Sequence, residues 1–148
     1  MEEKNIQMSL KLFVVLSRAY KVVNEETNEW IYQNGLNPTE FGVLELLYHK
    51  GPQPLQQIGS KILLASGSIT YVVDKLEKKG LVERVACPTD RRVTYAAITE
   101  KGRAVIEEIF PKHAENIHSL MSVLDDEEKE TAIRLLKKIG LAVKDLST

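Results

Sequence analysis

The sequence predicts a mainly α fold with a small β-hairpin wing (α+β), arranged as a winged helix-turn-helix with additional helices at both ends. Two short segments with helical spacing of apolar residues lie on either side of a break at residues 64–67. Two alternating segments, LVERVA and VTYAAIT, then flank the charged loop CPTDRR. Apolar stripes with helical spacing also run through residues 1–35 and 104–148. Together these patterns favour a central winged helix-turn-helix lobe with additional helices on either side of it.

The first predicted helix carries an apolar stripe and continues towards Trp30 and Ile31 before Gly35 ends it. The stripe consists of Ile6, Leu10, Phe13, Leu16, Tyr20 and Val23. A short helix should follow, because Asn37 suits a helix cap and Pro38 the first helical position. We expect this helix to turn Phe41, Leu44 and Leu47 inward.

Two amphipathic helices joined by a tight turn are predicted next, and this pair is the DNA-reading unit of helix-turn-helix proteins. In the first of them, Leu55, Ile58 and Ile62 repeat at helical spacing. The inward residues of the second are expected to be Ile69, Val72, Val73 and Leu76. Gly80 should end it, since glycine tolerates the positive φ found at helix C-termini.

The outward face of this second helix carries the candidate DNA contacts. Its start offers small polar donors, so Ser68, Thr70 and Tyr71 are candidates for base contacts, and Ser66 is a candidate cap and contact. Further along the helix, Lys75 and Lys78 are candidates for phosphate contacts. The alternative is an ordinary solvated helix face.

The predicted wing carries Asp90, Arg91 and Arg92 in its loop. The Asp90 carboxylate lies two residues before Arg92, close enough to pair with a guanidinium and brace the hairpin. The other arginine is then free to enter a minor groove, where the negative potential attracts guanidinium groups. The sequence leaves open which arginine has which role, and an ordinary charged hairpin loop is the alternative.

Beyond Thr99, which suits a helix cap, two more amphipathic helices are predicted. The apolar residues of the first are Val105, Ile109, Ile117, Leu120, Met121 and Leu124. Asp125 and Glu128 have the spacing of a capping box for the second, whose face is formed by Leu135, Leu136, Ile139, Ala142, Val143 and Leu146. These faces predict dimerisation, with burial inside one chain as the alternative. We expect residues 1–148 to form one domain, with a winged helix-turn-helix lobe at 36–103 and dimerisation helices at 1–35 and 104–148.

Composition agrees with a globular DNA-binding protein of the cytoplasm. The 148 residues are 43% hydrophobic, and no apolar run approaches the length of about 18 residues that crosses a membrane. No secretion signal is recognisable at the N-terminus, and a single cysteine excludes an internal disulfide. Residues 55–103 hold 9 basic and 5 acidic side chains, whereas the whole chain has a net charge of −1. The predicted winged helix-turn-helix lobe is therefore the basic part of the chain, as contact with DNA phosphates requires.

Catalysis is not supported by the sequence. His113 and His118 are five residues apart and so point to different faces of a helix, and no cysteine or carboxylate pair completes a metal site. Dinucleotide-binding loops and serine-nucleophile motifs are absent as well. We expect no enzyme activity, no metal and no cofactor.

Residues 37–103 resemble the MarR family of bacterial transcriptional regulators, most clearly in VVDKLEKKGLVER, the Asp90-Arg91-Arg92 wing and AITEKG. The resemblance extends over nearly the whole chain. It implies a homodimer that binds a roughly palindromic operator in double-stranded DNA, most commonly as a repressor. For many members it also implies release by a small aromatic ligand or by oxidation. A winged helix that binds another protein is the alternative function.

The resemblance also suggests where a regulatory ligand would bind, in a pocket between the dimerisation helices and the winged helix-turn-helix lobe. Tyr20, Trp30, Phe41 and Tyr48 are the candidates to line it, and aromatic walls suit a phenolic or quinone-like ligand. Plain core packing of these residues is the alternative. Some family members sense oxidants through a cysteine in the first helix, but the only cysteine here is Cys87, at the start of the wing loop. Cys87 is thus either a small hairpin residue or a redox switch.

Overall fold

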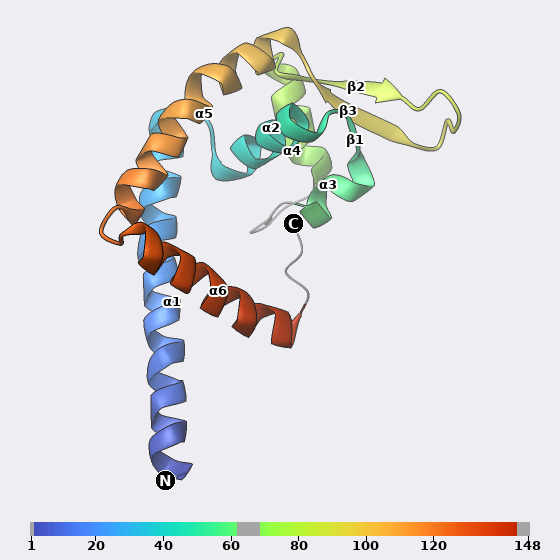
Figure 1. Ribbon diagram of the computed structural model, residues 1–148. Helices are drawn as coiled ribbons and strands as arrows, with labels where there is room; N and C mark the ends of the chain where they lie inside the picture. The colour runs from blue at the N-terminus through green and yellow to red at the C-terminus, as the bar shows by residue number, and fades with distance from the viewer. Residues whose placement is uncertain (1, 62–68, 145–148) are drawn as a thin grey trace. The chain divides into compact units, whose positions relative to one another are not determined.

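The computed structural model describes residues 2–61 and 69–144, and in these ranges it contains six helices and three short strands (Figure 1). The chain divides into two compact units, Met1–Pro38 and Thr39–Thr148. The first unit is helix α1 (Glu2–Gln33), a single helix of 32 residues. It ends as predicted before Gly35, which adopts φ +86°.

The other elements belong to the second unit, apart from Pro38 at the start of α2. In chain order they are α2 (Pro38–Lys50), β1 (Gln53–Pro54), α3 (Leu55–Lys61), α4 (Ile69–Lys78), β2 (Val82–Ala86), β3 (Thr94–Ile98), α5 (Glu100–Met121) and α6 (Asp126–Val143). This order of helices followed by a hairpin confirms the predicted fold class. None of the described helices is both long enough and apolar enough to cross a membrane.

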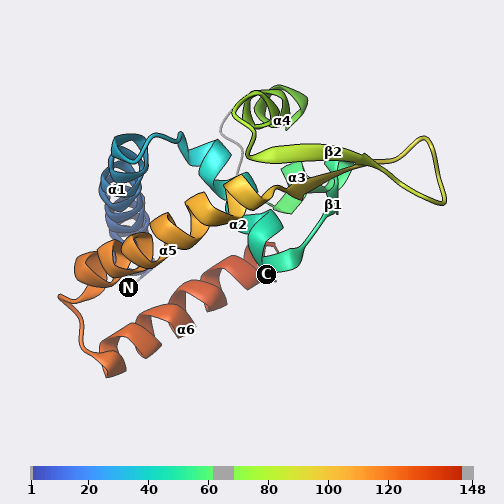
Figure 2. The same cartoon turned by 90° about the horizontal axis from the view of Figure 1, so that it is seen from above.

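The strands form an antiparallel sheet in the order β1-β3-β2. Strand β2 pairs with β3 from Val82 opposite Ile98 to Ala86 opposite Thr94. Figure 2 shows this hairpin reaching well beyond helices α3 and α4. The two-residue strand β1 pairs with β3 on its other side, a strand that the sequence analysis did not predict. A strand of two residues is too short to show alternation.

The core of the second unit is built from the inward faces of the helices and one face of the sheet. Its fully buried side chains include Val43, Leu44, Leu47, Ile58, Val73, Leu76, Val82, Ala96 and Ile106. The pattern of the α4 residues is the one expected from helical periodicity, except that Ile69 is only half-buried. Burial of this face fixes which side of α4 is turned to solvent.

Two of the predicted N-terminal caps, Thr99 and Asp125, are present. Thr99 accepts a hydrogen bond from the Gly102 N–H at the start of α5. At the start of α6, Asp125 and Glu128 form the reciprocal hydrogen bonds of a capping box. Gly80 adopts φ +77° directly after α4, which is the conformation expected for a glycine that ends a helix.

Candidate functional site

Helix α4 turns a polar face to solvent. The Tyr71 side chain is 61% exposed, and Thr70, Lys75 and Lys78 are exposed as well. The ammonium group of Lys75 lies 5.5 Å from the centroid of the Tyr71 ring, a cation–π arrangement that holds the two side chains together. The predicted contacts Ser66 and Ser68 lie outside the described residues. The face thus combines an aromatic hydroxyl with two cations.

The wing loop, residues 87–93, is closed by backbone hydrogen bonds from the Cys87 N–H to the Val93 carbonyl and from the Val93 N–H to the Asp90 carbonyl, both 3.1 Å long. Within it, Asp90 accepts hydrogen bonds from Arg92 Nε at 3.1 Å and from the Arg92 backbone N–H at 3.0 Å. The guanidinium hydrogen bond lowers the pKa of the Asp90 carboxyl. Arg92 is therefore the bracing arginine.

Arg91 occupies the neighbouring position of the loop, and its side chain is exposed. Within residues 2–61 and 69–144 no ion pair or hydrogen bond holds its guanidinium. The ambiguity that the sequence left open is thus resolved, because one arginine pairs with Asp90 and the other projects from the loop. A projecting guanidinium suits the narrow minor groove of DNA.

A third arginine connects the wing to α4. Arg84 of β2 donates from Nη2 to Asp74 Oδ1 and from Nη1 to Glu77 Oε1, each at 2.6 Å. The hydrogen bond to Asp74 is the main cause that raises the pKa of Arg84 above its ordinary value. Because both carboxylates belong to α4, this network joins the helix to the hairpin.

The C-terminal end of α4 is held from two other helices. Lys79 Nζ lies 2.8 Å from Glu40 Oε2 of α2, and the Glu40 side chain is only 3% exposed. The Lys79 carbonyl accepts a hydrogen bond from Lys101 Nζ of α5 at 2.9 Å. A buried carboxylate needs such a cation, since burying an unpaired charge is costly. This ion pair connects helices that lie far apart in sequence, and the sequence analysis missed it.

The turn after α4 also packs directly on the start of α5. The Thr99 hydroxyl donates to the Gly80 carbonyl at 2.6 Å, and the Thr99 N–H donates to the Leu81 carbonyl at 3.1 Å. A Cβ on Gly102 would overlap the Leu81 carbonyl oxygen and would lie 2.9 Å from Ile98 Cγ1. The TEKG motif therefore serves a close backbone approach that only glycine permits.

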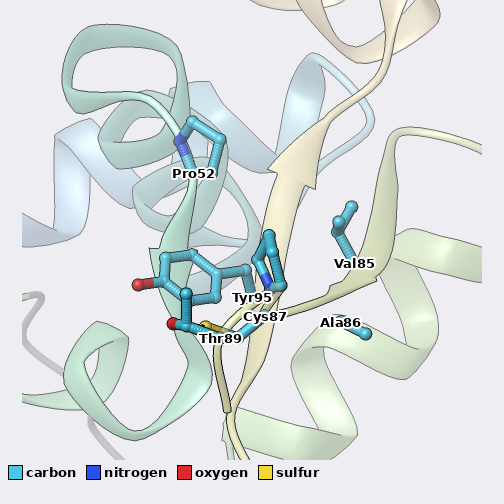
Figure 3. Close-up of a pocket in the computed structure, with 7 residues that line it drawn as sticks. Pro52, Val85, Ala86, Cys87, Thr89 and Tyr95 are labelled. Atoms are coloured by element: carbon cyan, nitrogen blue, oxygen red, sulfur yellow. The ribbon is translucent and has the colours of Figure 1, made fainter. Parts of the chain in front are cut away.

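Cys87 lies beside a hollow of about 390 Å³ on the wing (Figure 3). The residues labelled there are Pro52, Val85, Ala86, Cys87, Thr89 and Tyr95. Cys87 Sγ lies 3.4 Å from Thr89 Oγ1, and this hydrogen bond lowers the pKa of the thiol. The thiolate fraction at neutral pH is accordingly raised.

The four aromatic candidates for ligand binding occupy different surroundings. Phe41 is 3% exposed and its ring centroid lies 4.8 Å from that of His113 in α5. Tyr48 donates to Glu107 at 3.3 Å, and the Arg103 guanidinium lies 5.4 Å from its ring centroid. These two residues therefore connect α2 to α5.

The other two candidates, Tyr20 and Trp30, belong to α1 and thus to the first unit. Tyr20 is 60% exposed and Trp30 is half-buried. A pocket formed by all four aromatic residues stays a prediction.

Both terminal helices expose apolar side chains. On α1 these include Ile6, Leu10, Leu12, Phe13, Val15, Tyr20 and Val22. On α6 they are Ile133, Leu135, Leu136, Ile139, Leu141 and Val143. Of the 18 residues of α6, none is buried within the chain. Apolar surface of this extent is typical of interaction sites in soluble proteins.

Comparison with known proteins identifies the family to which the chain belongs. Residues 36–94 match the model of the MarR family. The chain is 64% identical over 138 residues to the HTH-type transcriptional regulator MhqR of Bacillus subtilis, covering 93% of this chain and 95% of that protein. It is 31% identical to the transcriptional repressor MprA of Escherichia coli, covering 78% of this chain and 66% of that protein.

A solved structure agrees with these sequence matches. It comes from a study of how 6-hydroxynicotinic acid regulates DNA binding of BpsR from Bordetella bronchiseptica. This structure has a TM-score of 0.74 and 27% identity to the chain, covering 87% of this chain and 98% of the other. Sequence relatives and structural neighbour thus place the winged lobe in the same group of proteins, and the chain belongs to the MarR family of DNA-binding transcriptional regulators.

Proposed function

We propose that the protein is a homodimeric repressor that binds a roughly palindromic operator in double-stranded DNA. Each protomer inserts α4 into a major groove, where Thr70 and Tyr71 contact bases and Lys75 and Lys78 contact phosphates. The wing of each protomer reaches the flanking minor groove with Arg91. The observation that carries this proposal is the exposed Arg91 guanidinium beside a braced Asp90–Arg92 pair, on the basic part of the chain.

Dimerisation is proposed because α1 and α6 leave apolar side chains exposed in the single chain. Burying them against a second copy would release ordered water, which is the main driving force of such association. Truncation of residues 1–15 or 134–148 should therefore cause aggregation or loss of cooperative unfolding, together with loss of operator binding. A well-folded monomer of the full chain at micromolar concentration in sedimentation would contradict the dimer.

We further propose that a small aromatic ligand releases the repressor from DNA. Support comes from the structural neighbour BpsR, whose DNA binding is regulated by 6-hydroxynicotinic acid. The aromatic residues Tyr20, Trp30, Phe41 and Tyr48 are the candidates to bind such a ligand. A ligand acts only if it binds the DNA-incompetent form more tightly than the DNA-bound form. The factor by which saturating ligand weakens DNA binding then equals the ratio of those two affinities.

A thiol switch is the second candidate for the signal, and the lowered pKa of Cys87 on the wing favours it. Oxidation or alkylation there would alter the hairpin that carries Arg91. The two candidates differ in a simple way, because only the thiol switch needs the sulfur. Cys87→Ser should retain DNA binding in both cases and lose the response only in the second.

The test begins by selecting a duplex from a pool of randomised double-stranded DNA, using the full-length protein. Binding to this selected duplex is then measured by fluorescence anisotropy with and without 6-hydroxynicotinic acid and simple phenols. We expect a selected sequence with two-fold symmetry and release by at least one aromatic compound in both parent and Cys87→Ser. Failure to enrich any duplex would contradict the operator, and a response lost in Cys87→Ser would establish the thiol as sensor.

A further inference from the structure

The recognition helix carries two carboxylates as well as its cations. Asp74 and Glu77 lie on α4, with side chains that are 49% and 43% exposed. Asp74 is four residues before Lys78 and therefore shares a side of the helix with it. A carboxylate in this position repels the phosphates that the lysines attract. An interface built on α4 needs some means of suppressing these charges.

Arg84 is placed to pair with both carboxylates and offset part of their charge. Its two terminal nitrogens each lie 2.6 Å from one carboxylate, and its backbone N–H donates to Glu77 Oε2 at 3.3 Å. The side chain is 26% exposed, so the ion pairs are partly shielded from water. A planar guanidinium with several fixed donors can hold two carboxylates at once, which a lysine ammonium does with less geometric control.

We propose that Arg84 is a positioning residue for DNA binding, which acts by pairing with Asp74 and Glu77 on the recognition helix and offsetting part of their negative charge rather than by contacting DNA. The inference rests on the proposed role of α4 as the helix that enters the major groove. With Arg84 present, the three side chains carry a net charge of −1, and without it they carry −2. At 0.1 M salt, charges about 10 Å apart still interact, so this difference reaches the phosphates beside α4.

The test is a thermodynamic cycle measured on the selected duplex by fluorescence anisotropy at 50 mM salt. Arg84→Gln should weaken binding by about tenfold or more, because two uncompensated carboxylates then face DNA. Asp74→Asn with Glu77→Gln should strengthen binding by the parent, since these substitutions raise the net charge of the three side chains from −1 to +1. The same two substitutions in Arg84→Gln should restore at least the parental affinity, since they raise the net charge of these positions from −2 to 0.

Further measurements separate this role from a purely structural one. The loss in Arg84→Gln should shrink as salt rises, whereas a misplaced helix would bind poorly at every salt concentration. Arg84→Lys, which keeps the charge, should bind far better than Arg84→Gln and serves as the test if the latter fails to fold. Glu83→Gln is the matched control, because alternation along β2 turns Glu83 to the opposite face, and its effect should stay below about twofold.

Three results would overturn the inference. Affinity that remains low in the triple variant would mean that Arg84 itself contacts DNA. No gain from the two carboxylate substitutions in Arg84→Gln would mean that their charges do not weaken DNA binding. Unaltered affinity in Lys75→Ala and Lys78→Ala would remove α4 from the interface and so refute the proposed function too. Weakened binding in those lysine variants together with low affinity in the triple variant would refute the Arg84 inference alone.

Discussion

Substitution of Arg91 by alanine is the sharpest perturbation of the proposed interface. The Arg91 guanidinium takes part in no ion pair within the described part of the chain, so its removal should leave the folded state intact. Each cation that neutralises a phosphate contributes about −0.9 to the slope of log K against log salt. Two wings per dimer therefore contribute about −1.8 to the slope.

This slope converts directly into a measurable difference. Between 50 and 200 mM salt the parent should lose about 12-fold more affinity than Arg91→Ala. This factor is the fourfold rise in salt raised to the power of about 1.8, the difference between the two slopes. At a fixed salt concentration of 100 mM, we expect the variant to bind about 10- to 100-fold more weakly. Its thermal unfolding should match that of the parent.

The assay is an anisotropy titration of the selected duplex at four salt concentrations. Lys112→Ala is the matched control, since it removes an exposed positive charge from α5, outside the proposed interface. We expect that control to retain the parental slope. A parental slope in Arg91→Ala would show that the wing makes no ionic contact with DNA and would refute the role assigned to its tip.

Three further predictions concern the lobe around α4. Gly102→Ala should lower the free energy of unfolding by about 1–3 kcal/mol, because its methyl group meets a backbone carbonyl, and an unchanged melting temperature would contradict this close approach. Lys79→Met should cost about 3 kcal/mol in chemical unfolding by removing the ammonium group that pairs with the buried Glu40 carboxylate, whereas full stability would mean that this ion pair does not stabilise the fold. Thr89→Val should raise the pKa of Cys87, whose thiol loses a hydrogen bond, so that the pH midpoint of alkylation by iodoacetamide moves upward; an unmoved midpoint would exclude Thr89 as the cause.

Local periodicity carried most of the fold prediction. Val72, Val73 and Leu76 are buried because a helix brings such positions to one side, and this rule needs no knowledge of the remaining chain. Gly80 and the Asp125 cap follow equally local rules of backbone geometry. Helices, hairpin and polar face of α4 were therefore accessible from the sequence.

Contacts between distant segments were not accessible in this way. Glu40 and Lys79 are 39 residues apart, and a lone carboxylate near a helix start resembles an ordinary capping residue. Arg84 sits in an alternating strand, where a charged side chain is usually taken to face solvent. The choice between Arg91 and Arg92 depends on the backbone of the loop, which composition alone does not specify.

The central claim is that two copies of the chain read DNA symmetrically with α4 and the wing. Hydroxyl-radical footprinting of the selected duplex tests it most directly, in the parent and in Arg91→Ala. We expect two central protected segments about 34 Å apart, one helical turn of DNA, flanked by minor-groove protections that disappear in Arg91→Ala. A single protected block without two-fold symmetry, or flanking protections that persist in Arg91→Ala, would contradict it.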